Sequence, residues 1–120
     1  MRNCVAVLLI VLCVGAWAAP VPAAAETVTG EVISLACYFE NRKYVGKAGL
    51  LCAQASVKHE GNPVGLLTAD GTVYQFAGGL VANNNAKAAP LLTHTVTVTG
   101  DVYEKNGTKV ISADDAKMVK

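Results

Sequence analysis

The stretch Val28-Thr29-Gly30-Glu31-Val32 is nearly repeated seventy residues later as Val98-Thr99-Gly100-Asp101-Val102. Each copy lies in a longer run in which Val and Thr alternate, and alternation with a period of two is typical of a half-buried strand. A glycine inside a strand often marks a bulge or a sharp bend. Because a flat sheet cannot close on itself, two long strands that each bend at a glycine favour a small closed barrel.

The remaining strands follow from turn residues. The long strands are expected at residues 26–38 and 93–104, with Val96, Val98 and Val102 on one face of the second. Asp70-Gly71 separates two short apolar runs at residues 63–69 and 72–77, and this dipeptide predicts a hairpin. Asn106-Gly107 predicts a second hairpin, from the second long strand into a strand at residues 108–112.

Two segments between the strands are helical candidates. Residues 46–59 carry small and apolar side chains at helical spacing and end at Gly61-Asn62-Pro63, while residues 83–92 begin with three asparagines that could serve as N-caps. The order predicts a mainly β fold, a five-stranded OB-like small barrel with an inserted helix after strand 1 and a short helix before strand 4. An open five-stranded α+β sheet is the alternative.

The first 25 residues have the pattern of an export signal. Arg2 precedes an apolar run at residues 4–16, and Ala23-Ala24-Ala25 supplies the small residues that a signal peptidase accepts, with a cut after Ala18 as a second option. The apolar run is shorter than the roughly 20 residues that a membrane-spanning helix needs. We therefore expect a periplasmic or secreted protein with one domain at residues 26–120 and no stable membrane anchor.

Removal of the leader leaves a neutral chain. Arg2 is one of ten Lys and Arg residues, so nine basic residues remain to balance nine acidic ones. A protein that binds phosphate backbones usually carries a clear basic excess, so a nucleic-acid partner is not expected. The expected partner is a protein or a small ligand, and the oligomeric state stays open.

Cys37 and Cys52 are the two cysteines that remain after the leader is removed. Export, a count of two and a small domain together favour a disulfide. In the chain-entropy model, a loop of this length would stabilise the fold by about 3 kcal/mol. We therefore expect a structural bond between Cys37 and Cys52.

Metal binding is the alternative for the same cysteines. Cys52, Ser56 and His59 fall at i, i+4 and i+7 of the expected helix and so share one face. Together with Cys37, Cys52 and His59 would offer two thiolates and an imidazole, which suit Zn or Cu. Neither a Cys-x-x-Cys pair nor a cysteine-nucleophile signature surrounds these residues. We therefore expect a non-enzymatic protein without a cofactor.

Tyr38, Arg42, Lys43 and Tyr44 form a cluster of basic and aromatic residues between the two cysteines. Aromatic residues beside basic ones can stack on single-stranded bases in OB domains, but the neutral charge of the chain argues against this use. The cluster is interpreted as a partner surface, with a solvated loop that is anchored by tyrosines as the alternative.

The chain resembles a family of small exported bacterial proteins with an OB-like fold and no established activity. The family pattern is Cys-Tyr, then Gly-Lys-x-His-x-x-Cys-Ala-x-x-x-Cys, then Gly-x-Pro-Val-Gly and an Asp-Gly-x-x-Tyr hairpin. The matching positions are Cys37-Tyr38, Gly46-Lys47, Cys52-Ala53, Gly61-Asn62-Pro63-Val64-Gly65, Asp70-Gly71 with Tyr74, and Val98-Thr99-Gly100. The resemblance covers most of the chain after the leader.

Two departures from that pattern bear on the cysteines. The chain has Gly49 where the pattern has His, and Ser56 where it has the last Cys. If the relatives hold a metal through four such ligands, this chain retains Cys37 and Cys52 alone. The resemblance therefore favours the disulfide over the metal site.

Overall fold

The computed structural model describes residues 24–119. The predicted leader, residues 1–25, lies outside the described residues except for Ala24 and Ala25. These two alanines begin the first strand and pair with Val102 and Asp101 of the fourth.

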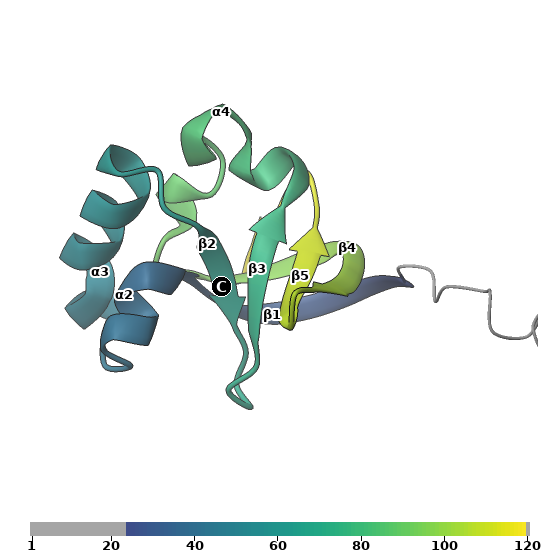
Figure 1. The fold of residues 1–120 in the computed structure, drawn as a ribbon, viewed down its shortest axis with the longest axis horizontal. Coiled ribbons are helices and arrows are strands. Elements are labelled where there is room, and N and C mark those ends of the chain that lie inside the picture. Colours follow the sequence, from purple (N-terminus) through teal and green to yellow (C-terminus); the bar gives the residue numbers. More distant parts are fainter. Residues whose placement is uncertain (1–23, 120) are drawn as a thin grey trace, which may run out of the picture.

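Five strands form a closed barrel, as the sequence predicts. They are β1 (Ala24–Ser34), β2 (Val64–Leu67), β3 (Val73–Ala77), β4 (Thr95–Lys105) and β5 (Thr108–Ser112). Their order is β1-β2-β3-β5-β4, and the pairing of β1 with β4 closes the ring (Figure 1). The β3–β5 pair is parallel and the other pairs are antiparallel. This mixed barrel with a few short helices is OB-like, and the open-sheet alternative is wrong.

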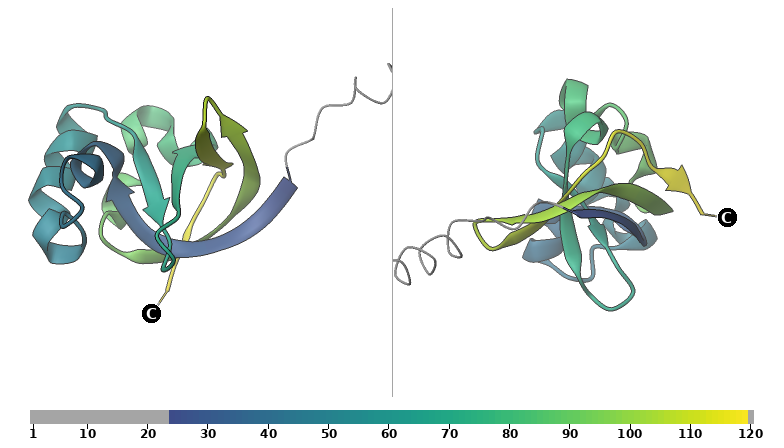
Figure 2. Two further views of the ribbon diagram at one scale, coloured as in Figure 1. Left: turned by 60° about the horizontal axis from the view of Figure 1, so that its bottom comes forward. Right: turned by 90° about the vertical axis from the view of Figure 1, so that its right-hand side faces the viewer.

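The two repeated glycines allow the long strands to curve around the barrel. Figure 2 shows β1 as one long curved strand. A Cβ added to Gly30 would lie 2.5 Å from the carbonyl oxygen of Leu67, and one added to Gly100 would collide with that of Ser112. Each glycine therefore lets a neighbouring strand approach more closely than any other residue would permit.

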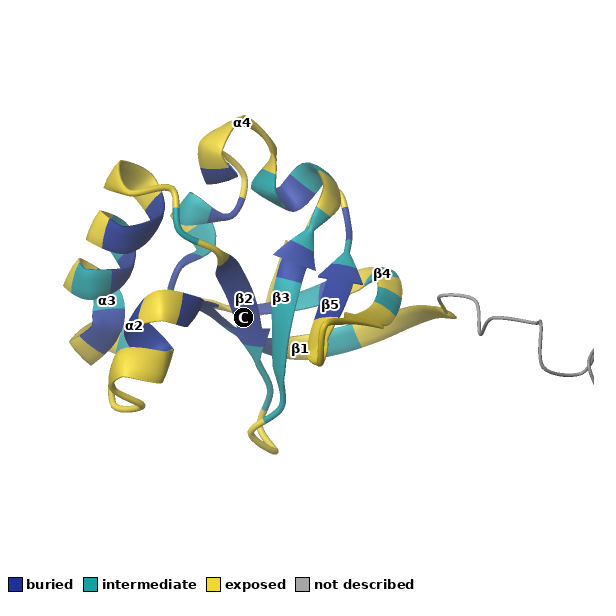
Figure 3. Ribbon diagram, in the orientation of Figure 1, coloured by how far each residue is buried: buried dark blue, intermediate teal, exposed yellow. Residues whose placement is uncertain are grey.

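The core fills the barrel and continues under the helices. Val96 and Val98 of β4 are fully buried, and Val102 of the same strand packs against the core from a partly exposed position. Buried positions also lie on β2 and toward the ends of β3 and β5 (Figure 3). A smaller cluster outside the main core contains Ile33, Leu35 and Tyr38.

The chain leaves β1 earlier than expected. The strand predicted at residues 26–38 ends at Ser34, and helix α2 (Leu35–Glu40) follows it, so placing Cys37 on a strand was wrong. Ser34 has extended backbone angles, and its Oγ accepts a hydrogen bond from the Cys37 N–H at 3.3 Å. Ser34 is thus an N-cap, which satisfies a donor that a helix start leaves free.

The helix inserted between β1 and β2 is present. Helix α3 (Gly46–Gln54) continues into a π-helical turn, η1 (Ala55–His59), so the predicted range of residues 46–59 is confirmed. Its buried residues are Gly49, Ala53, Ser56 and Val57, whereas Leu51 is 82% exposed. The small and apolar residues of this helix therefore do not all face the barrel.

The segment before β4 is mostly irregular. A short helix before β4 is present as predicted, but it is not continuous over residues 83–92: the structure has a 3₁₀ turn η2 (Gly78–Val81), the short α4 (Ala82–Asn85) and a second 3₁₀ turn η3 (Ala89–Leu91). Asn83, Asn84 and Asn85 all have positive φ, between 56° and 62°, so they do not cap a helix. Asparagine tolerates this left-handed region better than most residues do.

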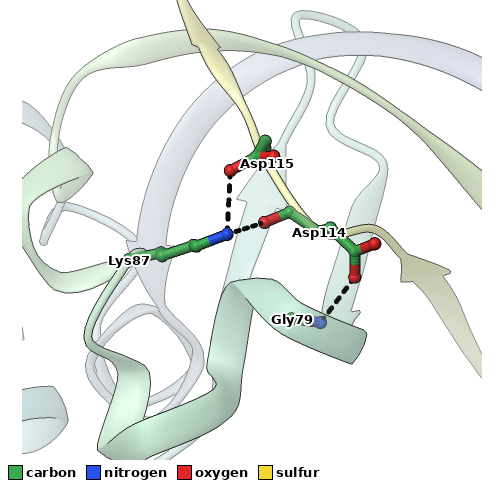
Figure 4. A network of polar contacts seen from close by, with 4 residues as sticks. All are labelled: Gly79, Lys87, Asp114 and Asp115. Carbon is green, nitrogen blue, oxygen red and sulfur yellow. Dashed lines mark hydrogen bonds and ion pairs between the residues drawn. The ribbon is translucent and has the colours of Figure 1, made fainter.

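A short strand that the sequence pattern did not predict, β6 (Lys117–Met118), pairs with Val96 and Thr97 of β4. Polar contacts fix the segment that leads to it (Figure 4). Lys87 Nζ lies 3.0 Å from Asp115 Oδ1 and 3.0 Å from the main-chain oxygen of Asp114. The Gly79 N–H donates to Asp114 Oδ1 at 3.2 Å, so the segment after β5 is held against η2.

Candidate functional site

A disulfide joins the two helices that follow β1. Cys37 of α2 is bonded to Cys52 of α3, with a Cα–Cα distance of 6.1 Å and fifteen residues of separation. The predicted disulfide is confirmed, although it joins helix to helix rather than strand to helix. It ties the inserted helix to the end of β1.

Buried hydroxyls connect the disulfide to the loop before β2. Ser34 Oγ, which accepts from the Cys37 N–H, donates to Ser56 Oγ at 3.0 Å. Ser56 Oγ also accepts from Asn62 Nδ2 at 2.9 Å. Ser34 and Ser56 are 2% and 4% exposed, so these polar groups depend on one another for partners. Ser56 is therefore one link in this chain of bonds.

The residues of the metal alternative do not lie together as ligands. The sulfurs of Cys37 and Cys52 are bonded to each other, and His59 is exposed at the end of η1. Among residues 24–119, no three His, Cys, Asp or Glu side chains lie close enough to hold a metal ion. A thiolate site would require the disulfide to be reduced.

The basic and aromatic cluster lies in α2 and the turn after it. Tyr38 is only 7% exposed, while its neighbour Phe39 is 57% exposed. The Arg42 guanidinium carbon lies 5.2 Å from the centre of the Tyr38 ring and 5.8 Å from that of Phe39. Lys43 is exposed and Tyr44 is partly buried. Arg42 therefore already has cation–π contacts within the chain, and Tyr38 serves mainly to anchor α2.

A hollow of about 260 Å³ lies between the loop before β2, strand β3 and helix α4. Side-chain amides of Asn62, Gln75, Asn84 and Asn85 border it, with Phe76 and Val81 as its apolar neighbours. Asn85 is 6% exposed, and its Nδ2 donates to the main-chain oxygen of Asn62 at 3.3 Å. Asn84 Nδ2 lies 3.4 Å from the main-chain oxygen of Lys58. These bonds hold the left-handed asparagines against the loop.

A second hollow, of about 330 Å³, lies between β3 and the β4–β5 hairpin. Gln75 and Phe76 also border this hollow, so the two hollows adjoin at β3. Tyr103 and Lys105 of β4 contribute to its wall, together with Thr108 and Val110 of β5. The bordering strands and α4 are labelled in Figure 1. We call the two hollows together the β3 groove.

None of the residues predicted as site residues borders the β3 groove. The alternation of β3 places Gln75 outward, because its neighbours Tyr74 and Phe76 pack against the core. The sequence alternation alone could have predicted that Gln75 points outward. It could not have predicted the other segments that border the groove, which come from residues 61–63, 84–85 and 103–110.

The tip of the β2–β3 hairpin contains the one described side chain whose pKa clearly departs from its usual value. A hydrogen bond from the Thr68 hydroxyl, together with one from the Thr72 N–H at 3.1 Å, lowers the pKa of Asp70 from 3.8 to about 2. These bonds favour the ionised carboxylate. Asp70 is fully exposed to solvent and borders neither hollow.

Comparisons of the chain with models of protein families, with curated proteins and with solved structures found no match. Within residues 24–119, no helix is long and apolar enough to cross a membrane.

Proposed function

We propose that the protein is an exported, non-enzymatic binding module that holds its ligand in the β3 groove. The observation that carries the proposal is the meeting of two hollows, of about 260 and 330 Å³, at Gln75 and Phe76. Ligand sites of globular proteins are concave and combine apolar surface with a few convergent polar groups. The β3 groove has both features.

The scaffold around the groove supports the same proposal. Gln75 pairs with Gly65 of β2 on one side and with Val110 of β5 on the other, so it is held from both edges of its strand. The disulfide and the serine bonds fix the loop that supplies Asn62. Binding groups on a rigid scaffold lose little conformational entropy when a ligand arrives. Export is supported by the leader pattern and by the disulfide.

Chemical-shift mapping of the oxidised, ¹⁵N-labelled protein tests the proposal. Three probes are added separately: the trimer of N-acetylglucosamine, the tri-alanine peptide and a thymidylate hexamer. We expect at least one probe to shift the side-chain amides of Gln75 and Asn84 together with the backbone signal of Lys105. Shifts that centre on Phe39 and Leu51 would contradict the proposal, and so would the absence of shifts with all three probes.

A further inference from the structure

The first hollow is bordered by four side-chain amides, and its described lining carries no charged side chain. Each amide carries a carbonyl acceptor beside an NH₂ donor, and the NH₂ groups of Asn62, Asn84 and Asn85 already donate within the protein. A hydroxyl group also donates and accepts, so an amide can make both kinds of bond to a ligand that displays neighbouring hydroxyls. An ionised ligand would find no opposite charge among these residues, and its desolvation would therefore be costly. The chemistry fits a neutral, hydroxyl-rich group.

The pairing of β3 argues against an extended peptide as the ligand. Peptides that add to a sheet need a strand edge with free main-chain groups. Gln75 of β3 is paired with Gly65 on one side and Val110 on the other. Recognition at Gln75 must therefore use its side chain, which favours a ligand that displays polar groups over one that adds as a strand.

The second hollow adds an aromatic side chain and one cation. Tyr103 is 36% exposed and borders this hollow with Lys105. An exposed aromatic ring can pack against the apolar C–H face of a sugar ring. Among the described residues that line the two hollows, Lys105 is the one cation. A single cation is too little for a nucleic-acid backbone, because its affinity depends on many phosphate contacts.

The size of the groove indicates a short oligomer rather than a single small molecule. Each hollow, at about 260 and 330 Å³, lies at or below the lower end of the range of roughly 300–1,000 Å³ for small-molecule sites. A ligand that filled only one hollow would bury little surface. A short oligomer could place one unit among the amides and the next beside Tyr103.

We infer that the β3 groove binds a neutral oligosaccharide, with one sugar among the four amides and the next against Tyr103. This inference rests on the proposed function and names its ligand class. Gln75, at the junction of the hollows, would contact both sugar units.

Titration calorimetry with the oxidised full chain tests the ligand class. The probes are the N-acetylglucosamine trimer, the glucose trimer, the tri-alanine peptide and, as an anionic comparison, the galacturonic acid trimer. We expect at least one neutral sugar trimer to bind more tightly than the anionic one. Gln75→Ala should weaken binding about fivefold, the factor that corresponds to one ordinary hydrogen bond. Tyr103→Ala should weaken it by a similar or larger factor.

Two control variants test whether a loss of binding comes from the groove itself or from substitution of any glutamine or exposed aromatic residue. Gln54→Ala changes the other glutamine, on α3, and Phe39→Ala changes an exposed aromatic residue on α2. Both should bind like the wild type.

Three outcomes would contradict one or both of the claims. If the peptide or the anionic trimer binds most tightly and Gln75→Ala weakens that binding, the groove stands but the ligand class is wrong. If neutral trimers bind and only Phe39→Ala weakens them, or if no probe binds, both claims are wrong.

Discussion

Asn85 Nδ2 donates a hydrogen bond of 3.3 Å to the main-chain oxygen of Asn62, and this bond joins α4 to the loop before β2. Asn85 is buried and has a φ of 62°, which most residues adopt only at a cost. Asn85 thus makes two contributions: its side chain donates to a loop carbonyl, and the residue tolerates the left-handed backbone conformation at this position.

Substitutions of Asn85 should separate these two contributions. Asn85→Gly removes the hydrogen bond but suits the backbone, and should cost about 0.5–1.5 kcal/mol. Asn85→Ala adds the strain of a left-handed alanine and should cost about 1–2 kcal/mol more. Urea unfolding measures the difference. Equal free energies of unfolding for the two variants would show that the left-handed backbone at residue 85 does not disfavour alanine.

The disulfide should supply a large share of the stability. Replacement of both Cys37 and Cys52 by Ser opens a loop with fifteen residues of separation and should lower the free energy of unfolding by about 3 kcal/mol. Unfolding of the wild-type protein with reductant should give a similar loss. A double variant as stable as the oxidised wild type would contradict the structural role of the bond.

The buried serines should behave as a coupled pair. Ser56→Ala removes an acceptor of both Ser34 and Asn62, and should cost about 1–3 kcal/mol because the buried Ser34 hydroxyl loses its partner. Ser34→Ala removes an N-cap and should cost about 0.5–2 kcal/mol. The double variant should lose less than the sum of the two, by roughly 0.5 kcal/mol or more, the coupling of residues in contact. Strict additivity would contradict the network.

Gly30 and Gly100 should resist replacement even by alanine. Gly30→Ala and Gly100→Ala each force a Cβ against a neighbouring strand, and should cost about 1–3 kcal/mol. Thr99→Ala is the matched control on the exposed face of β4, where it removes a hydroxyl contact to Thr27 at 2.8 Å. It should cost about 0.2–1 kcal/mol. If alanine at either glycine costs no more than the control, the close approach is not required.

Asp70 should make the stability depend on acid pH. Its pKa is about 2 in the folded protein, below the 3.8 expected without these hydrogen bonds. The ionised carboxylate therefore stabilises the fold above about pH 4, and this contribution is lost as the pH falls towards about 2. Asp70→Asn should lack this part of the pH dependence. An NMR titration of the carboxyl carbon that gives a pKa near the usual 3.8 would contradict the hydrogen bonds to Thr68 and Thr72.

Local signals in the sequence predicted the barrel well. Asn106-Gly107 is a tight hairpin turn with φ of 53° and 80°, since both residues tolerate the left-handed region. Gly30 and Gly100 marked the strand bends because glycine weakens a strand interior unless a bend or a close backbone contact requires it. These features depend on residues that are adjacent in the chain, which is why they could be predicted.

Other features depend on competition between local signals or on distant contacts. Ser34 ended β1 as an N-cap, although the hydrophobic residues after it could also have continued a strand. The asparagines at residues 83–85 adopted left-handed angles, whereas their polarity alone also suits a helix start. The β3 groove combines segments far apart in sequence, and no local pattern reports their meeting.

The proposed function depends on a ligand that occupies the β3 groove across Gln75. Intermolecular nuclear Overhauser effects between the oxidised protein and the N-acetylglucosamine trimer would locate such a ligand. We expect contacts from trimer protons to both the Gln75 side-chain amide and the Tyr103 ring, which border adjoining hollows. A trimer that binds but contacts only the α2–α3 surface around Phe39, and neither groove residue, would contradict the proposal.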